Sequence, residues 1–298
     1  MSGLNSKRLK KVLWAMDKAG LDAYLASTPV TMGYLAGFHE SGGERMLLMV
    51  IVKSGQISVI APHLSFTHAA HTGIEDIRCW SDGEDPGVLF EQIAIEKGLK
   101  TAVIGVDDEM PAAHLIRLQQ ALPAALFKAA GFVMAEVRKC KEPEELEKMR
   151  RAAHIADATY HDSLVAIKPG KTEIDIQRVL ISGMSDRGGV PTFCIVATGQ
   201  NGAEPHHSTS ATQLKEGELV VMDWGCSLEG YLSDITRTVC LGKASSDARK
   251  VYSIVRDAHM AAREAIRPGV PCQDLDKAAR KVIVDAGFGD YFIHRTGH

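Results

Sequence analysis

The sequence predicts a two-domain protein of the α/β (α+β) class. Helical and strand patterns alternate through residues 1–138, and a five-residue string recurs 99 residues downstream within residues 139–298. The length of 298 residues agrees with two domains, since about 150 residues is typical of one. We place the boundary at 138/139, before the charged hinge Lys141-Glu-Pro-Glu-Glu145.

Periodicity and turn residues predict the elements of the first domain. Helices are expected where apolar residues recur every three or four positions, and strands where short apolar runs end at turn signals. In chain order these are a helix over 6–18, a strand over 23–26, a hairpin of 46–52 and 56–60, a helix over 86–97, a strand over 101–106 and a helix over 112–121.

The second domain contains an internal repeat. Residues 166–170 (Ala-Ile-Lys-Pro-Gly) recur as 265–269 (Ala-Ile-Arg-Pro-Gly), and several Asp and Gly residues match at the same shift. Each unit is expected to form a long helix, a Pro-Gly turn, a second helix and a closing glycine. Strand patterns follow Gly188 as far as Gly242, whereas only 11 residues follow Gly287. We therefore expect the second unit to lack its strands.

Composition and charge exclude several classes of function. The net charge is −3, which gives no electrostatic footprint for nucleic acid. The longest apolar run, 46–52, is far shorter than the roughly 20 residues of a membrane span. The six cysteines are scattered, and the N-terminus has no signal-peptide pattern. Together these features predict reduced thiols and a cytoplasmic location.

Most of the residues that could carry chemistry lie in 219–241. A simple antiparallel pairing of two strands, centred between residues 228 and 229, sets Asp223 directly opposite Asp234. Facing carboxylates repel each other, so either one takes a proton or cations bind between them. The spacing leaves an alternative open, in which Asp223 caps a turn and Asp234 pairs with Arg237.

Histidines near this hairpin are further candidates. Pro205-His206-His207 lies 17 residues before Asp223, in a loop rich in Gly, Asn and Ser, and the sequence ends in His294-Arg-Thr-Gly-His298. Two carboxylates with an imidazole suit Mn²⁺, Co²⁺, Fe²⁺ or Zn²⁺. By themselves, however, loop histidines are usually solvated and terminal ones disordered.

These residues resemble the creatinase/methionine-aminopeptidase superfamily, and within it the Xaa-Pro aminopeptidase and prolidase group, over nearly the whole chain. The resemblance implies a creatinase-like N-terminal domain over residues 1–138. It also implies an incomplete pita-bread metallopeptidase domain over 139–298, whose C-terminal part is missing. The resemblance is closest at 195–199, 205–207, Asp223-x-Gly225, 230–238 and 294–298.

The resemblance also implies a metal site. In the family two Asp, one His and two Glu hold two divalent ions, with Mn preferred and Co, Zn or Fe as alternatives. Asp223, Asp234 and His298 match the first three ligands. The two Glu are expected after residue 298, so we expect this sequence to be an N-terminal fragment. Residues 1–298 alone are then expected to bind metal weakly and to be inactive.

Three further residues receive roles by the same resemblance. His206 matches a catalytic, substrate-side histidine outside the metal ligands. His207 beside it is a weaker candidate for substrate binding. Thr236 lends a hydroxyl of the kind that orients a metal-bound carboxylate.

The activity implied is metal-dependent hydrolysis of the bond before proline, by a hydroxide shared between two metal ions. The expected partners are a peptide or small-molecule substrate and a second copy in a full-length homodimer, with neither nucleic acid nor a membrane. One alternative is creatinase-like hydrolysis of another small-molecule C–N bond. A second is a non-catalytic pita-bread protein that binds a partner, although the intact candidate ligands argue against it.

Overall fold

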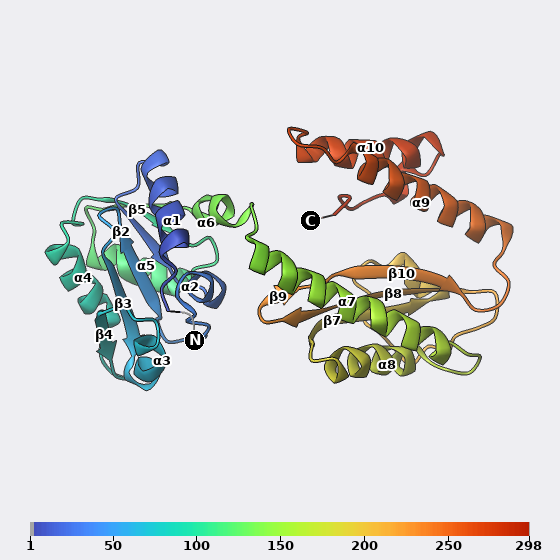
Figure 1. Cartoon of the computed structure of the whole chain (residues 1–298), viewed down its shortest axis with the longest axis horizontal. Helices are drawn as coiled ribbons and strands as arrows, with labels where there is room; N and C mark the ends of the chain where they lie inside the picture. Colours follow the sequence, from blue (N-terminus) through green and yellow to red (C-terminus); the bar gives the residue numbers. More distant parts are fainter. Residues whose placement is uncertain (1–2, 298) are drawn as a thin grey trace. The chain divides into compact units, whose positions relative to one another are not determined.

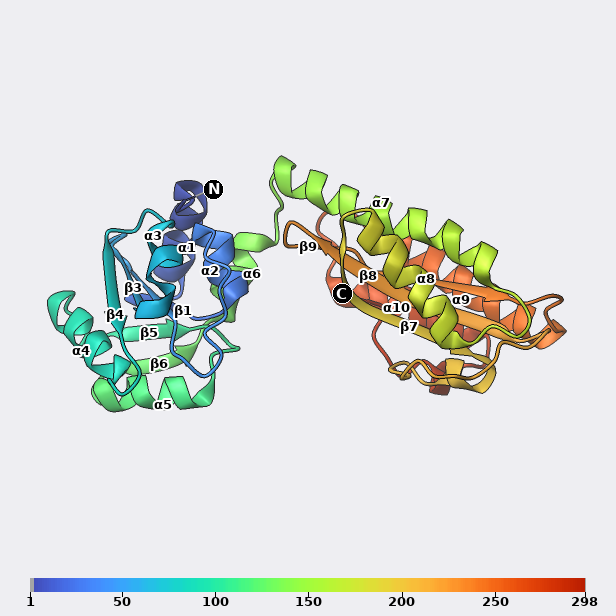
Figure 2. The same ribbon diagram turned by 90° about the horizontal axis from the view of Figure 1, so that it is seen from below.

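The computed structural model describes residues 3–297, and the chain divides into two compact units, Met1–Lys141 and Glu142–His298. Figures 1 and 2 show each unit as a sheet with helices packed on it. Within the described residues, no helix has the length and apolar character needed to cross a membrane.

The first unit is built on one mixed six-stranded sheet. The central strand β1 pairs antiparallel with β2 on one side and parallel with β5 on the other. The outer pairs β3–β4 and β5–β6 are parallel. Across the sheet the order is β4 (Asp76–Trp80), β3 (Ile57–Pro62), β2 (Leu48–Val52), β1 (Ala23–Ala26), β5 (Val103–Val106) and β6 (Leu126–Ala129).

Helices cover both faces of this sheet, so its central strands are buried throughout. Alternate residues of β1 enter two cores: Tyr24 belongs to one and Leu25 to the other. The first core includes α1 (Ser6–Lys18), α2 (Pro29–Ala36), α3 (Phe66–Ala70, after the 3-10 turn His63–Ser65) and α6 (Gly131–Arg138), and the second α4 (Pro86–Glu96) and α5 (Ala112–Ala121).

The predicted elements of the first unit are confirmed. Helices over 6–18 and 112–121 and the strand over 23–26 match the structure at both ends, and the predicted hairpin is β2–β3. Sequence analysis did not predict α2, β4, β6 or α6. These elements are short, and their apolar residues cover too few turns or alternations to show a period.

The second unit carries a smaller antiparallel sheet. Its order is β10 (Ile235–Cys240), β8 (Leu219–Leu228) and β7 (Val190–Thr198), and the short β9 (Tyr231–Leu232) continues the pairing with β8. Helices α7 (Pro143–Ala166) and α8 (Glu173–Asp186) pack on one face of this sheet. Alternate residues of β8, including Met222 and Trp224, fill the core between the helices and the sheet.

The internal repeat is visible in the structure as two helix–turn–helix units. The second consists of α9 (Ser246–Ala265) and α10 (Cys272–Asp285), which share a small core of their own. Gly170 and Gly269 occupy the same turn position with φ of 83° and 87°, a conformation that favours glycine. After α10 the described residues contain the 3-10 turn Gly289–Tyr291.

Candidate metal centre

The carboxylate hairpin forms as predicted, but in a different register. Asp223 pairs with Thr236 in β10, not with Asp234. The reason is the turn, because Glu229 and Gly230 both have positive φ (52° and 84°) and close β8–β9 as a two-residue hairpin loop. Strand β8 therefore runs unbroken to Leu228, and the pairing is centred one residue later than predicted.

This register keeps both aspartates on one face of the sheet. Continuing it sets Asp234 beside Gly225, two residues along from Asp223, so the two are diagonal neighbours on the same face. The backbone is tight at this point, because a Cβ on Gly225 would lie 2.0 Å from the carbonyl oxygen of Ser233. Glycine thus lets the segment before β10 approach β8 closely.

Asp223 is half-buried and lies on the opposite face of β8 from Met222 and Trp224. Burial raises the pKa of its carboxyl, and the negative charge of Asp234 raises it further. One hydrogen bond opposes these effects, since the hydroxyl of Thr236 donates to Asp223 Oδ1 at 2.7 Å. A cation bound beside Asp223 and Asp234 would offset the repulsion between their carboxylates and favour the charged form of Asp223.

The structure brings together Asp223, Asp234 and Thr236, and it leaves the third proposed ligand unplaced. His298 lies outside the described residues. Among residues 3–297 no three His, Cys, Asp or Glu side chains are close enough together to hold a metal ion. Oxygen donors of this type suit hard and borderline divalent ions, so the two aspartates fit part of such a site.

The segment that leads to His298 is held on α10. Asp276 Oδ1 accepts hydrogen bonds from the backbone N–H and the hydroxyl of Thr296, at 2.7 and 2.9 Å. Arg280 pairs with Asp276 at 2.9 Å and donates to the carbonyl oxygens of Phe292 and His294. These bonds fix the backbone two residues before the candidate ligand.

The two loop histidines differ in exposure. His206 is exposed, whereas the His207 side chain is only 9% exposed. His207 Nε2 lies 2.9 Å from Glu173 Oε2, at the start of α8. The structure therefore turns His207 toward Glu173, whereas His206 is exposed to solvent.

Glu173 is the residue of this region that sequence analysis missed. Its side chain is fully buried and sits at the start of a helix, where a glutamate is ordinarily a surface residue. The available signal was the string Thr172-Glu-Ile-Asp175 after the Pro-Gly turn, which marks a helix start. That signal locates the helix but says nothing of the loop that packs on it.

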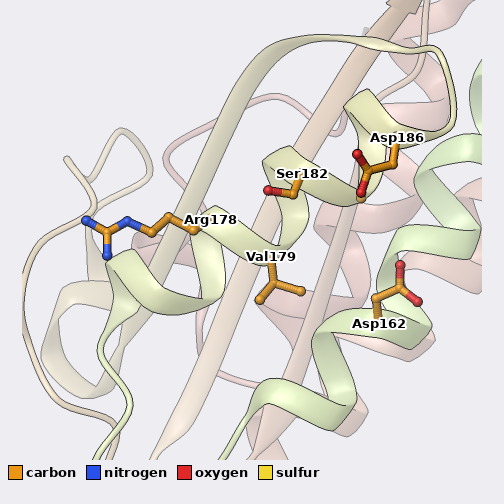
Figure 3. A pocket seen from close by; sticks show the side chains of 6 residues that line it. Asp162, Arg178, Val179, Ser182 and Asp186 are labelled. Carbon is orange, nitrogen blue, oxygen red and sulfur yellow. The ribbon is translucent and has the colours of Figure 1, made fainter.

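A pocket between α7 and α8 contains none of the predicted site residues (Figure 3). Arg178, Val179 and Ser182 line it from α8, and Asp162 does so from α7. These helices pack on the face of the sheet opposite Asp223. The pocket is therefore separate from the candidate metal centre.

Comparison with known proteins decides the family. Residues 147–298 match the model of metallopeptidase family M24, and residues 8–140 match the creatinase/prolidase N-terminal domain. The chain belongs to the M24 metallopeptidases. The fold expected from the resemblance, a creatinase-like domain followed by a pita-bread domain, is thereby confirmed.

Relatives of this M24 chain are named dipeptidases and prolidases. It is 35% identical to the probable dipeptidase PepE of Mycobacterium tuberculosis, over 98% of this chain and 79% of that protein. It is 32% identical to the Xaa-Pro dipeptidase of Lactobacillus helveticus, over 96% and 79%. The crystal structure of the prolidase from Thermococcus sibiricus matches with a TM-score of 0.92 and 30% identity, over 100% of this chain and 82% of that one. The prediction of a metallopeptidase is confirmed.

Proposed function

We propose that this M24 chain is a hydrolase of the Xaa-Pro aminopeptidase or dipeptidase type, which cleaves the peptide bond before proline. The observation that carries the proposal is the pair Asp223 and Asp234, on one face of the sheet within the residues that match the M24 model. The names of the relatives, dipeptidase and Xaa-Pro dipeptidase, support the substrate class.

Asp223, Asp234 and His298 would hold divalent metal, with two ions and Mn as the proposed content. When bound, such ions polarise the scissile carbonyl and lower the pKa of an attacking water. Thr236 fixes the orientation of the Asp223 carboxylate through its hydrogen bond. The unequal settings of the aspartates, with Asp223 half-buried and Asp234 exposed, leave Asp234 open to the solvent side where a substrate would enter.

His206 is the proposed catalytic residue on the substrate side. Its imidazole is exposed on the loop that joins β7 and β8, the same two strands whose register positions Asp223. An imidazole N–H there would donate a hydrogen bond to the carbonyl oxygen as this oxygen gains negative charge. Because proline nitrogen carries no hydrogen in the peptide bond, we propose that recognition of the leaving residue rests on ring shape.

Hydrolysis of Ala-Pro by the Mn²⁺-loaded chain is the test of this proposal. The expectation that residues 1–298 alone are inactive stays a prediction, so binding is measured as well. We expect millimolar Ala-Pro to raise the Tm of the Mn²⁺-treated protein more than Ala-Ala or creatine does. An equal shift for Ala-Ala contradicts the preference for proline, and a larger shift for creatine supports the creatinase-like alternative.

The variant His206→Gln separates catalysis from binding in the same assays. Loss of a hydrogen bond made mainly in the transition state lowers kcat with little change in KM. Glu204→Gln is the matched control, since this exposed residue lies in the same loop. The homodimer remains a proposal from family resemblance, and the cytoplasmic location remains a proposal from the scattered cysteines. Light scattering measures the oligomeric state.

A further inference from the structure

The loop that carries His206 is tied to one buried carboxylate. Glu173 Oε1 accepts hydrogen bonds from the backbone N–H of Thr198 and from Asn201 Nδ2, both at 2.8 Å. Glu173 Oε2 lies 2.9 Å from His207 Nε2 and accepts from the N–H and hydroxyl of Ser210, at 2.9 and 2.8 Å. Five hydrogen bonds therefore connect one side chain to both ends and the middle of the segment 198–210.

The backbone of the helix start adds to this connection. The N–H of Glu173 donates to the carbonyl oxygen of Thr212 at 3.0 Å, and that of Ile174 to Ser210 at 3.2 Å. On the strand side, Thr209 Oγ1 accepts from the N–H of Val196 in β7 at 2.9 Å. The loop is thus fixed between the start of α8 and the edge strand β7, which pairs with β8 at Asp223.

Glu173 is charged in this setting. Burial by itself raises the pKa of a carboxyl, but hydrogen bonds from Asn201, His207, Thr198 and Ser210 lower the pKa of Glu173 to about 2. A fully buried carboxylate is stable only when its oxygens are satisfied in this way. The donors of the loop depend on Glu173 in turn, because they have no equivalent acceptor once its charge is removed.

We propose that Glu173 is a positioning residue that holds loop 199–213, and with it His206, in the catalytic arrangement. In this arrangement His207 is a hydrogen-bond partner of Glu173 and does not contact the substrate. The part of the proposal that concerns His206 rests on the proposed function, whereas the anchoring of the loop does not. Glu173 itself touches no reacting atom, so its effect on catalysis passes through the loop.

The anchor is tested by replacing Glu173→Gln, which keeps the shape and removes the charge. We measure hydrogen exchange over 199–213 and the modification of His206 and His207 by diethyl pyrocarbonate, resolved by mass spectrometry. In the unmodified chain we expect rapid reaction at exposed His206 and protection of His207. In the variant we expect His207 to react at least tenfold faster and the loop amides to exchange at least tenfold faster.

Asp175→Asn is the matched control, because it removes a carboxylate from the same helix turn. The Asp175 carboxylate accepts hydrogen bonds from the backbone N–H and the hydroxyl of Thr172, and these bonds lie within the helix cap. We expect it to leave the reactivity of His207 unchanged. Ser210→Ala, which removes one donor to Glu173, provides a milder variant should Glu173→Gln fold poorly, and a smaller rise in loop exchange is then expected.

Turnover supplies the second readout. In the Ala-Pro assay Glu173→Gln is expected to lower kcat at least tenfold while KM changes less than threefold, since a displaced His206 affects the transition state more than binding. Folded Glu173→Gln with unchanged loop exchange and a protected His207 overturns the anchor. A loosened loop with unchanged kcat overturns the positioning of His206. An unmodified chain that neither hydrolyses Ala-Pro nor is stabilised by Ala-Pro more than by Ala-Ala refutes the proposed function, and the loop measurements still decide the anchor.

Discussion

The charge on Glu173 makes the free energy of unfolding of the second unit depend on pH. The folded-state pKa is about 2 and the ordinary value is 4.5, a difference that corresponds to about 3 kcal/mol. Because the pKa is depressed in the folded state, this stability is fully present above pH 4.5 and is lost as the pH falls toward 2. Glu173→Gln removes the charge, so it should remove this pH-dependent part.

Urea unfolding of the second unit measures this effect. Trp224 is fully buried in its core, and replacing Trp14 and Trp80 by phenylalanine leaves it as the only tryptophan in the chain. We expect Glu173→Gln in this background to lower the free energy of unfolding by about 3 kcal/mol or more at pH 7. The excess over 3 kcal/mol reports the loop donors that the amide leaves unpaired.

The pH dependence separates the charge from ordinary packing. The difference between the parent and Glu173→Gln should be constant from pH 7 to about 5 and should shrink below that, as the parent takes up its proton. Glu204→Gln, which neutralises an exposed carboxylate of the same loop, should follow the parent throughout. Parallel curves for the parent and Glu173→Gln between pH 5 and 2.5 would refute the reasoning.

Three further predictions concern the hairpin. Asp223→Asn relieves the repulsion with Asp234, so thermal melts should show a higher Tm without metal. Mn²⁺ at 100 times its Kd should stabilise the parent by about 2.7 kcal/mol and this variant by less than about 1 kcal/mol. Thr236→Val leaves Asp223 unoriented and should weaken Mn²⁺ binding about tenfold in calorimetric titration. Gly225→Ala places a methyl group 2.0 Å from a carbonyl oxygen and should cost about 3 kcal/mol or more in urea unfolding. Gly230→Ala, with open space at φ 84°, is its control at about 1 kcal/mol.

The sequence predicted the long elements well because their signals are local. Helix α1 has an apolar stripe and ends beside Gly20, and the paired Pro-Gly turns mark both helix–turn–helix units. The register of the carboxylate hairpin was not predictable from the same residues. It depends on which two residues form the turn, and Glu229 is an unusual choice for positive φ.

Long-range packing explains why the role of Glu173 was also missed. Its partners lie 25 to 37 residues away along the chain, in a loop with no periodic pattern. Sequence analysis could weigh His207 only by its neighbour His206 and by the polar loop around it. Whether an imidazole faces a substrate or a buried carboxylate is decided by where the loop folds back, and no local signal carries that information.

The two helix–turn–helix repeats of the second unit hold their loops through different residues. Gln177 in α8 and Asp276 in α10 are equivalent at the 99-residue shift. Gln177 Nε2 donates to the carbonyl oxygen of Cys194 in a strand, whereas Asp276 accepts from Thr296 in the segment before His298. The amide of Gln177 can donate to a carbonyl oxygen of a strand. The carboxylate of Asp276 can only accept, and the segment before His298 offers it N–H and O–H donors. In each repeat, therefore, one acidic residue of the helix after the Pro-Gly turn fixes a segment that leads to a proposed site histidine. This residue is Glu173 in the first repeat and Asp276 in the second.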